Sequence, residues 1–259
     1  MKRKKRFFWA LVLLCAAGLL AGGSQLLQMS GQRRAGEEFY SSLRLQASAA
    51  PAGAEPGRGT SPQEKPEEPA AEEASFWEEN PQAVAWLSCP GTSLDFPVAQ
   101  GEDNDFYLNH LLDGSPHRYG CPFLDQGNAA DFSDRNSIVY GHHMAGGAMF
   151  APLTQYQSQA YYEAHPTLRL STPEASYTVE LFAGYPADPQ EDASPWQQVF
   201  LTEEEFSAWA RRAAERSCLE SGVLPGPGDR VLTLSTCETP SGTLRFVLHG
   251  ILREEKAGE

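Results

Sequence analysis

Hydrophobic and polar residues alternate in six short stretches of the chain, which are separated by Gly, Pro, Asn and Asp residues. The stretches are LDFPVAQ (94–100), SIVYGHH (137–143), TLRLST (167–172), SYTVELFAGY (176–185), RVLTLSTC (230–237) and TLRFVLHGIL (243–252). Alternation with a period of two is typical of β-strands, because successive side chains point to opposite faces. Many short strands with turn residues between them favour a sandwich or a barrel. The pattern therefore predicts a mostly β, largely antiparallel domain over residues 76–254.

Two stretches have helical spacing instead. At the start of this domain, FWEENPQAVAWLSC (76–89) predicts a short helix broken by Pro81 and then a strand. The second helix is predicted in LTEEEFSAWARRAAERSCLE, where Thr202 is a candidate N-cap and Glu205 follows three residues later. Apolar residues recur there at helical spacing: Phe206, Trp209, Ala210 and Ala213. This helix lies in the long connection 186–228, and connections of that length are frequently functional.

The first 29 residues have the pattern of a membrane signal anchor. Residues 1–6 form a basic tail with five Lys and Arg residues, and no further charged residue occurs before Arg33. The apolar stretch 7–29 is long enough to cross a bilayer core of about 30 Å. Because a basic tail holds its end in the cytoplasm, the rest of the chain is expected outside the membrane. A cleaved signal peptide is the alternative, since LAGG (20–23) supplies small residues, although the apolar stretch is longer than is usual for one.

A spacer separates this anchor from the β domain. Residues 30–46 favour a short helix next to the membrane, and residues 47–75 are rich in Ala, Pro, Gly and Glu. That composition has too few large apolar side chains to form a core, and its prolines favour an extended conformation. Residues 30–75 are therefore predicted to hold the domain away from the membrane, and residues 255–259 to form a C-terminal tail.

The net charge and the cysteine content limit the functions that the chain can have. The net charge of −14 argues against nucleic acid as a partner, because no basic surface is available to neutralise phosphates. The five cysteines are widely spaced and form no CxxC pair: Cys15, Cys89, Cys121, Cys218 and Cys237. Cys89 and Cys121 suit burial as small apolar residues, and disulfide formation stays open for the cysteines that follow the membrane segment.

Cys237 differs from the other cysteines because it lies where a strand ends in a turn. In RVLTLSTC the alternation puts Thr233, Ser235 and Cys237 on one face, and in TLRFVLHG it puts Arg245 on the face opposite the apolar one. If the turn ETPSGT (238–243) joins the two strands in register, both apolar faces meet the core. Cys237 and Arg245 then both point into one polar cleft.

His142 is the candidate partner for this thiol. A cysteine attacks as the thiolate, and because a free thiol has a pKa of about 8.5, it needs a base or a positive neighbour. Of the six histidines, His142 ends an alternating stretch directly after a glycine. The alternatives are an ordinary loop position for His142 and His143, or a zinc site made by both histidines and Cys237, although adjacent histidines rarely reach one ion. The acidic stretch DPQEDAS (188–194) lacks the ligand spacing of a calcium loop.

These motifs resemble those of the sortases, cysteine transpeptidases of Gram-positive cell surfaces. The resemblance is carried by TLSTC (233–237), the Arg at the start of the next strand and YGHHM (140–144) upstream, and it extends over residues 76–254. It is greatest to class B, which has segments similar to NPQAVAWLSCPGTSLDFPVAQGEDNDFYLNHLLDG and DFSDRNSIVYGHHM, and a helix in the connection before the cysteine strand. At His143 many class B members carry Asn instead. The resemblance implies a closed sortase-type β-barrel with a few short peripheral helices, including an N-terminal one.

Carried over residue by residue, the resemblance implies that Cys237 is the nucleophile and His142 the general acid or base. Arg245 would bind the substrate peptide and stabilise the oxyanion, a role that suits a guanidinium because it stays charged. Asn104 and Leu108 match a class B segment that lines the groove for the sorting signal. Further groove candidates flank the catalytic residues: Tyr140, Ser235, Thr236 and Glu238. No cofactor and no metal are implied.

The implied reaction is acyl transfer between two partners. Cys237 attacks a Thr carbonyl in the C-terminal sorting signal of a secreted protein, of an Asn-Pro-x-Thr or related type, and an amine of a peptidoglycan precursor or a pilin lysine resolves the thioester. The enzyme is expected in the cell membrane as a single-pass protein, with its catalytic domain facing the cell wall. A catalytically silent envelope domain is the alternative, but the chain retains Cys237 and Arg245. Papain-like peptidases place the Cys before the His, the opposite of the order found here.

Overall fold

The structure, a computed structural model, describes residues 22–24, 28–47, 76–144, 146–237 and 243–255, with only the backbone at Cys237. The chain divides into two compact units, residues 1–43 and 44–259, and each is described by itself. In the first unit, residues 22–24 are helical, and a longer helix begins at residue 28 and ends at residue 47 of the second unit. This confirms the helix expected over residues 30–46.

Most of the predicted anchor (7–29), the basic tail (1–6) and the spacer from residue 48 to residue 75 lie outside the described residues, as does the C-terminal tail after Glu255. None of the helices that the structure describes combines the length and the hydrophobicity needed to cross a bilayer. The anchor, the spacer and the tails therefore stay predictions.

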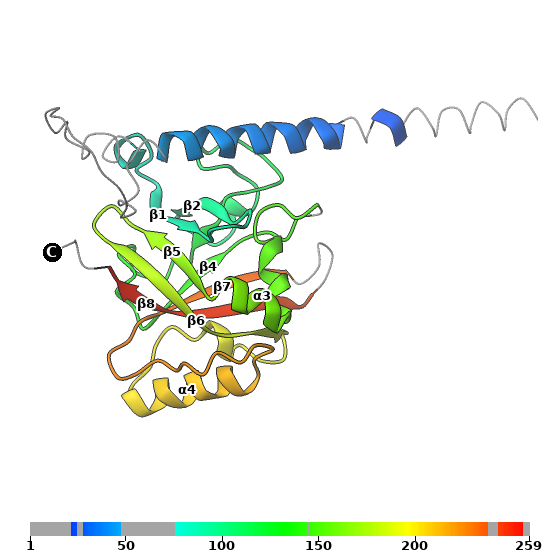
Figure 1. Cartoon of the computed structure of the whole chain (residues 1–259). Helices are drawn as coiled ribbons and strands as arrows, with labels where there is room; N and C mark the ends of the chain where they lie inside the picture. Colours follow the sequence, from blue (N-terminus) through cyan, green and yellow to red (C-terminus); the bar gives the residue numbers. More distant parts are fainter. Residues whose placement is uncertain (1–21, 25–27, 48–75, 145, 238–242, 256–259) are drawn as a thin grey trace, which may run out of the picture. The chain divides into compact units, whose positions relative to one another are not determined.

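Eight strands of the second unit form one closed barrel (Figure 1). They are β1 (Ala83–Ser88), β2 (Asp95–Gln100), β3 (Phe123–Leu124), β4 (Asn136–Tyr140), β5 (Thr167–Ser171), β6 (Ser176–Ala187), β7 (Val231–Cys237) and β8 (Arg245–Glu254). Around the barrel they follow the order β1-β2-β3-β4-β7-β8-β6-β5, and β5 pairs with β1 to close it. The mostly β barrel predicted from the sequence is confirmed.

All six alternating stretches form strands, and the β7–β8 hairpin has the expected register, with Cys237 paired to Arg245. The pattern does not predict β3, because two residues are too few to show a period. Two pairings are parallel, β2 with β3 and β4 with β7, and the other pairings in the barrel are antiparallel. The parallel pair β4–β7 brings distant parts of the chain side by side.

Short helices occupy the connections. They are residues 76–79, η1 (Phe106–Leu108), η2 (Ala151–Gln157), α3 (Gln159–Ala164), η3 (Ser194–Trp196) and α4 (Glu203–Glu215). The predicted cap of α4 is confirmed, since the Glu205 backbone N–H donates to the Thr202 hydroxyl at 3.2 Å. Three Glu residues in the first turn of α4 also stabilise its positive end.

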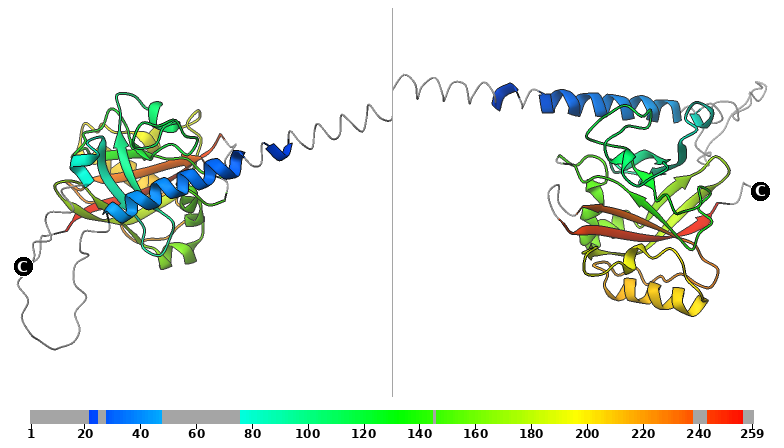
Figure 2. Two further views of the ribbon diagram at one scale, coloured as in Figure 1. Left: turned by 90° about the horizontal axis from the view of Figure 1, so that it is seen from above. Right: turned by 180° about the vertical axis from the view of Figure 1, so that it is seen from behind.

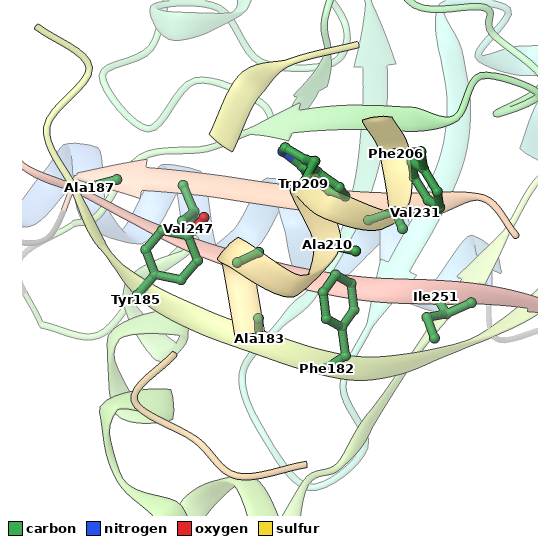
Figure 3. Close-up of a cluster of buried hydrophobic side chains, with 11 residues drawn as sticks. Phe182, Ala183, Tyr185, Ala187, Phe206, Trp209, Ala210, Val231, Val247 and Ile251 are labelled. Atoms are coloured by element: carbon green, nitrogen blue, oxygen red, sulfur yellow. The ribbon is translucent and has the colours of Figure 1, made fainter. Parts of the chain in front are cut away.

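α4 covers the outer face of β6, β7 and β8, as Figures 1 and 2 show. Its Phe206 and Trp209 are buried in one hydrophobic cluster with Val231, Val247 and Ile251 of the strands (Figure 3). The Trp209 indole N–H donates to the Ser194 carbonyl at 2.8 Å, so its one polar atom is satisfied. The connection 186–228 therefore forms a second layer outside the barrel.

The polar face of β7 is buried beneath this second layer. The alternation groups Thr233 and Ser235 with Cys237, yet both side chains are buried. Thr233 donates to Asn136 Oδ1 at 2.6 Å, and its oxygen lies 2.8 Å from His249 Nδ1. The Ser235 hydroxyl accepts from the Trp196 indole at 3.0 Å. Thr233 is therefore satisfied by two neighbouring strands of the barrel and Ser235 by the connection, so the polar residues of this face before Cys237 are buried.

His249 is fully buried in this layer and stays neutral. Thr233 gives its only hydroxyl proton to Asn136, so His249 Nδ1 carries a proton and donates to Thr233. The Nε2 atom then accepts from the Tyr185 hydroxyl at 3.2 Å. Burial, with a smaller contribution from the positive charge of Arg216, lowers the pKa of His249 from 6.5 to about 3.

We expect the free energy of unfolding to fall as the pH drops from 6.5 to about 3, because the unfolded chain protonates His249 in this range and the folded chain does not. The contribution is at most about 1.4 kcal/mol per pH unit and vanishes above this range, where the ring is neutral in both states. Chemical denaturation at a series of pH values measures it. The His249→Gln variant, which does not titrate, should show a shallower pH dependence than the wild type; equal slopes would contradict the assignment.

Candidate active site

The candidate active site lies where three strands of the barrel begin or end. β4 and β7 run parallel and pair as far as Tyr140 and Ser235, so their carboxyl ends meet at one edge. The Gly141 backbone N–H donates to the Ser235 carbonyl at 3.1 Å and extends this contact by one residue. β8 begins at the same edge with Arg245, which pairs with Cys237 at the end of β7. The barrel thus brings the backbone of the three predicted catalytic positions to one edge.

A pocket of about 330 Å³ opens at this edge. The described residues that line it are Asn104, Leu108, Phe123, Tyr140, Gly141, His142, Ser235, Thr236 and Arg245. Seven of them are predicted site residues, and only Phe123 and Gly141 were not expected. Glu238 lies outside the described residues. Two predicted catalytic side chains and five predicted groove residues therefore share one cavity.

Close packing against Phe150 requires a glycine at position 141, directly before His142. A Cβ atom at Gly141 would lie 2.6 Å from the ring of Phe150, closer than two carbon atoms can approach. The Phe150 backbone N–H in turn donates to the His142 carbonyl at 2.9 Å. Phe150 therefore contacts the chain at both residues and holds the end of β4 in place.

The main chain of η1 orients the His142 ring. His142 Nε2 lies 2.7 Å from the carbonyl oxygen of Leu108. Because a carbonyl only accepts hydrogen bonds, Nε2 carries a proton here, and in the neutral ring Nδ1 has the available lone pair. The contact therefore selects a tautomer that can take up a proton at Nδ1.

Asp125 does not line the pocket but binds two residues that do, and the sequence pattern does not reveal it. The residue is 8% exposed, and its carboxylate Oδ2 accepts hydrogen bonds from Asn104 Nδ2 and from the Tyr140 hydroxyl, each at 3.0 Å. Burial raises the pKa of Tyr140 well above its ordinary value, the Asp125 charge raises it further, and Arg245 opposes the shift. Tyr140 therefore keeps its proton and acts as a donor. A single Asp after the apolar stretch CPFL was the available signal, and it does not differ from that of an ordinary turn residue.

Comparison with known proteins identifies the family. The model of the sortase domain matches residues 87–253. Sortase B of Listeria monocytogenes is 36% identical over 160 residues, which are 62% of this chain and 64% of that protein. The chain spans the same 64% of Staphylococcus aureus sortase B. The chain belongs to the sortase family, whose members are cysteine transpeptidases. Both of these relatives are class B sortases, as the sequence motifs predicted.

Solved structures of sortase B have the same fold. The complex of Staphylococcus aureus sortase B with a substrate matches with a TM-score of 0.66 and 29% identity, covering 71% of this chain and 85% of that chain. A sortase B complexed with triglycine matches with a TM-score of 0.66 and 28% identity, covering 71% of this chain and 86% of that chain. The closed sortase-type barrel implied by the sequence is confirmed.

Proposed function

We propose that this chain is a class B-like sortase that cleaves a Thr-containing C-terminal sorting signal and transfers the acyl group to an amine. The observation that carries the proposal is the meeting, at one edge of the barrel, of His142, Arg245 and the end of β7 at Cys237. The substrate and triglycine complexes of related sortases support a peptide as the donor and an amine as the acceptor.

In the first half-reaction, His142 takes the thiol proton through Nδ1, and the Cys237 sulfur attacks the carbonyl carbon of the Thr. The carbonyl oxygen becomes an oxyanion, which Arg245 stabilises with its fixed charge and several N–H donors. When the intermediate collapses, the C–N bond breaks and His142 returns the proton to the departing amine. The products are a thioester on Cys237 and a released C-terminal peptide.

In the second half-reaction, the acceptor amine attacks the thioester carbon. His142 takes a proton from the attacking nitrogen, the C–S bond breaks, and the new amide leaves the thiolate behind. The proton on His142 then returns to the sulfur. An amine of a peptidoglycan precursor or a pilin lysine is the acceptor that this chemistry suits, because both are primary amines.

The pocket wall supports a peptide ligand. Leu108 and Phe123 supply apolar surface, while Asn104 supplies an amide. A wall that combines apolar surface with a few polar groups is typical of a ligand site.

The N-terminal sequence supports a location at the membrane. The basic tail 1–6 and the apolar stretch 7–29 suit a single-pass anchor with the N-terminus in the cytoplasm. The catalytic domain then faces the cell wall, where a secreted substrate and a wall precursor both emerge.

The test is a transpeptidation assay with the purified chain. Quenched fluorescent peptides with varied Thr-containing sorting motifs are supplied with and without triglycine. We expect cleavage of a subset of motifs, a product with triglycine attached by mass spectrometry, and a transient acyl adduct on Cys237. Failure to cleave any motif in the presence of the amine would refute the proposal.

Arg245→Ala is expected to lower kcat by about 10²- to 10³-fold with a smaller change in KM, because the lost interaction forms mainly in the transition state. Arg245→Lys should retain part of the activity, since it keeps the charge and loses the planar set of donors. Steady-state kinetics on a cleaved peptide measure both. Arg253→Ala is the matched control, because Arg253 lies near the other end of β8 and pairs with Glu180 and Asp229. A similar loss of kcat in both alanine variants would contradict the role of Arg245.

A further inference from the structure

The buried carboxylate of Asp125 binds two chain segments that form the wall of the pocket. Asp125 follows β3 directly, and its carboxylate accepts three hydrogen bonds. Asn104 Nδ2 and the Tyr140 hydroxyl donate to Oδ2 at 3.0 Å each, and the Gly127 backbone N–H donates to Oδ1 at 2.8 Å. The main chain of Asp125 is also anchored, since its N–H donates to the Ile138 carbonyl at 2.8 Å. The carboxylate therefore has a fixed position.

The two bonds at Oδ2 join the two segments that hold the His142 ring. Asn104 lies just before η1, whose Leu108 carbonyl accepts from His142 Nε2. Tyr140 ends β4 two residues before His142. One segment thus carries the imidazole, the other carries the carbonyl that orients it, and the Asp125 carboxylate connects them.

The Asn104 amide is fixed at both of its polar atoms. Its Nδ2 donates to Asp125, and its Oδ1 accepts from the Gln126 backbone N–H at 2.9 Å. One N–H and one lone pair of this amide remain for a ligand in the pocket that Asn104 lines. The remaining donor and acceptor match the N–H and C=O groups of an extended peptide.

We propose that Asp125 is the positioning residue of this active site. Its carboxylate holds the segment 104–108 against the end of β4, which sets the contact between the Leu108 carbonyl and the His142 ring and orients the Asn104 amide toward the substrate. The inference rests on the proposed role of His142. A carboxylate is required rather than an amide, because both of its oxygens accept hydrogen bonds. In either orientation an amide nitrogen would face a donor, the Gly127 N–H or the Asn104 nitrogen.

Asp125→Asn is the first test, because it conserves the shape of the side chain and replaces one of its two acceptor oxygens by a donor. We expect kcat/KM for a cleaved peptide to fall by about 10²-fold, mainly in kcat, since a small displacement of a reacting group has an effect of this size. Asp134→Asn is the matched control: Asp134 Oδ2 accepts from Asn128 Nδ2 at 2.9 Å and the Ala129 N–H at 2.7 Å, and Asp134 does not line the pocket. The control should lower the melting temperature and leave kcat/KM within about twofold of the wild type.

A reciprocal exchange separates positioning from a general loss of structure. In the double variant Asp125→Asn/Asn104→Asp, the amide at position 125 donates to the carboxylate at position 104, which still accepts from the Gln126 N–H. We expect the exchange to recover about tenfold in kcat over Asp125→Asn alone, whereas KM should not recover, because Asn104→Asp also removes the N–H that faces the substrate. Failure to recover would overturn the proposal, as would wild-type kinetics in Asp125→Asn.

The protonation of the His142 ring can be measured without any catalysis, so this measurement tests the inference separately from the proposed function. Two-bond ¹H–¹⁵N correlation spectra of the imidazoles report which ring nitrogen carries the proton. The wild type should show His142 as the Nε2–H tautomer, and Asp125→Asn should shift its resonances or mix the tautomers, whereas Asp134→Asn should not. Unchanged His142 resonances in Asp125→Asn would overturn the positioning role even if the wild type cleaves peptides. A wild type that cleaves no peptide would instead refute the proposed function.

Discussion

Cys237→Ala is expected to abolish both cleavage of a sorting peptide and transfer to an amine. Without the sulfur no thioester forms, and the Ser235 hydroxyl in the pocket wall is buried and bound to the Trp196 indole. We expect kcat/KM to fall by at least about 10⁴-fold, in the range seen when the nucleophile of a covalent mechanism is removed. The acyl adduct should be absent from the intact mass of the variant after incubation with a peptide that the wild type cleaves.

Cys218→Ala is the matched control for this variant. Cys218 is an exposed cysteine after α4, and it does not line the pocket. Its replacement should leave kcat/KM unchanged and should leave the acyl adduct in place. Full activity in Cys237→Ala, or loss of the adduct in Cys218→Ala, would contradict the assignment of the nucleophile.

The second large effect is expected for His142→Gln, with kcat lower by about 10³- to 10⁴-fold. Glutamine supplies an N–H that can donate to the Leu108 carbonyl, as His142 Nε2 does at 2.7 Å, so the η1 contact is preserved. It has no group that accepts and returns a proton as Nδ1 does. The activity should therefore fall while the melting temperature stays close to that of the wild type, and stopped-flow kinetics with differential scanning calorimetry measure the two quantities.

His143→Ala is the control for this second variant, because His143 is adjacent in sequence and does not line the pocket. We expect it to retain kcat within a few-fold of the wild type, consistent with a role in the loop alone. A His142→Gln variant that keeps more than about a tenth of the wild-type kcat would show that another group moves the proton.

Much of the fold follows from local periodicity. The Thr202 cap and the helical spacing of Phe206 and Trp209 predict α4, and the structure confirms both the cap and the burial of these side chains. The alternation in RVLTLSTC and TLRFVLHG predicts the hairpin that pairs Cys237 with Arg245. β3 escapes prediction because two residues in a strand show no period.

The site is predicted less completely than the strands. The motifs predict catalytic roles for His142 and Arg245, and both residues line the pocket. Asp125 is missed because its significance comes from two partners, Asn104 and Tyr140, that lie elsewhere in the chain. The burial of Ser235 is also missed. Its polar side chain is covered by the connection 186–228, and the alternation within β7 contains no information about that connection.

By itself, the sequence determined where α4 and every strand of the barrel except β3 lie, which family the chain belongs to, and the residue types that carry the proposed chemistry. Only the tertiary structure decided that β4 and β7 run parallel and end at one edge, that the connection 186–228 covers the outer face of β7, and that Asp125 links the segments around His142. The physical reason is that the hydrophobic period of a segment reflects only which of its side chains are buried against the core. Pairing between distant strands, and hydrogen bonds across them, arise only when the barrel closes.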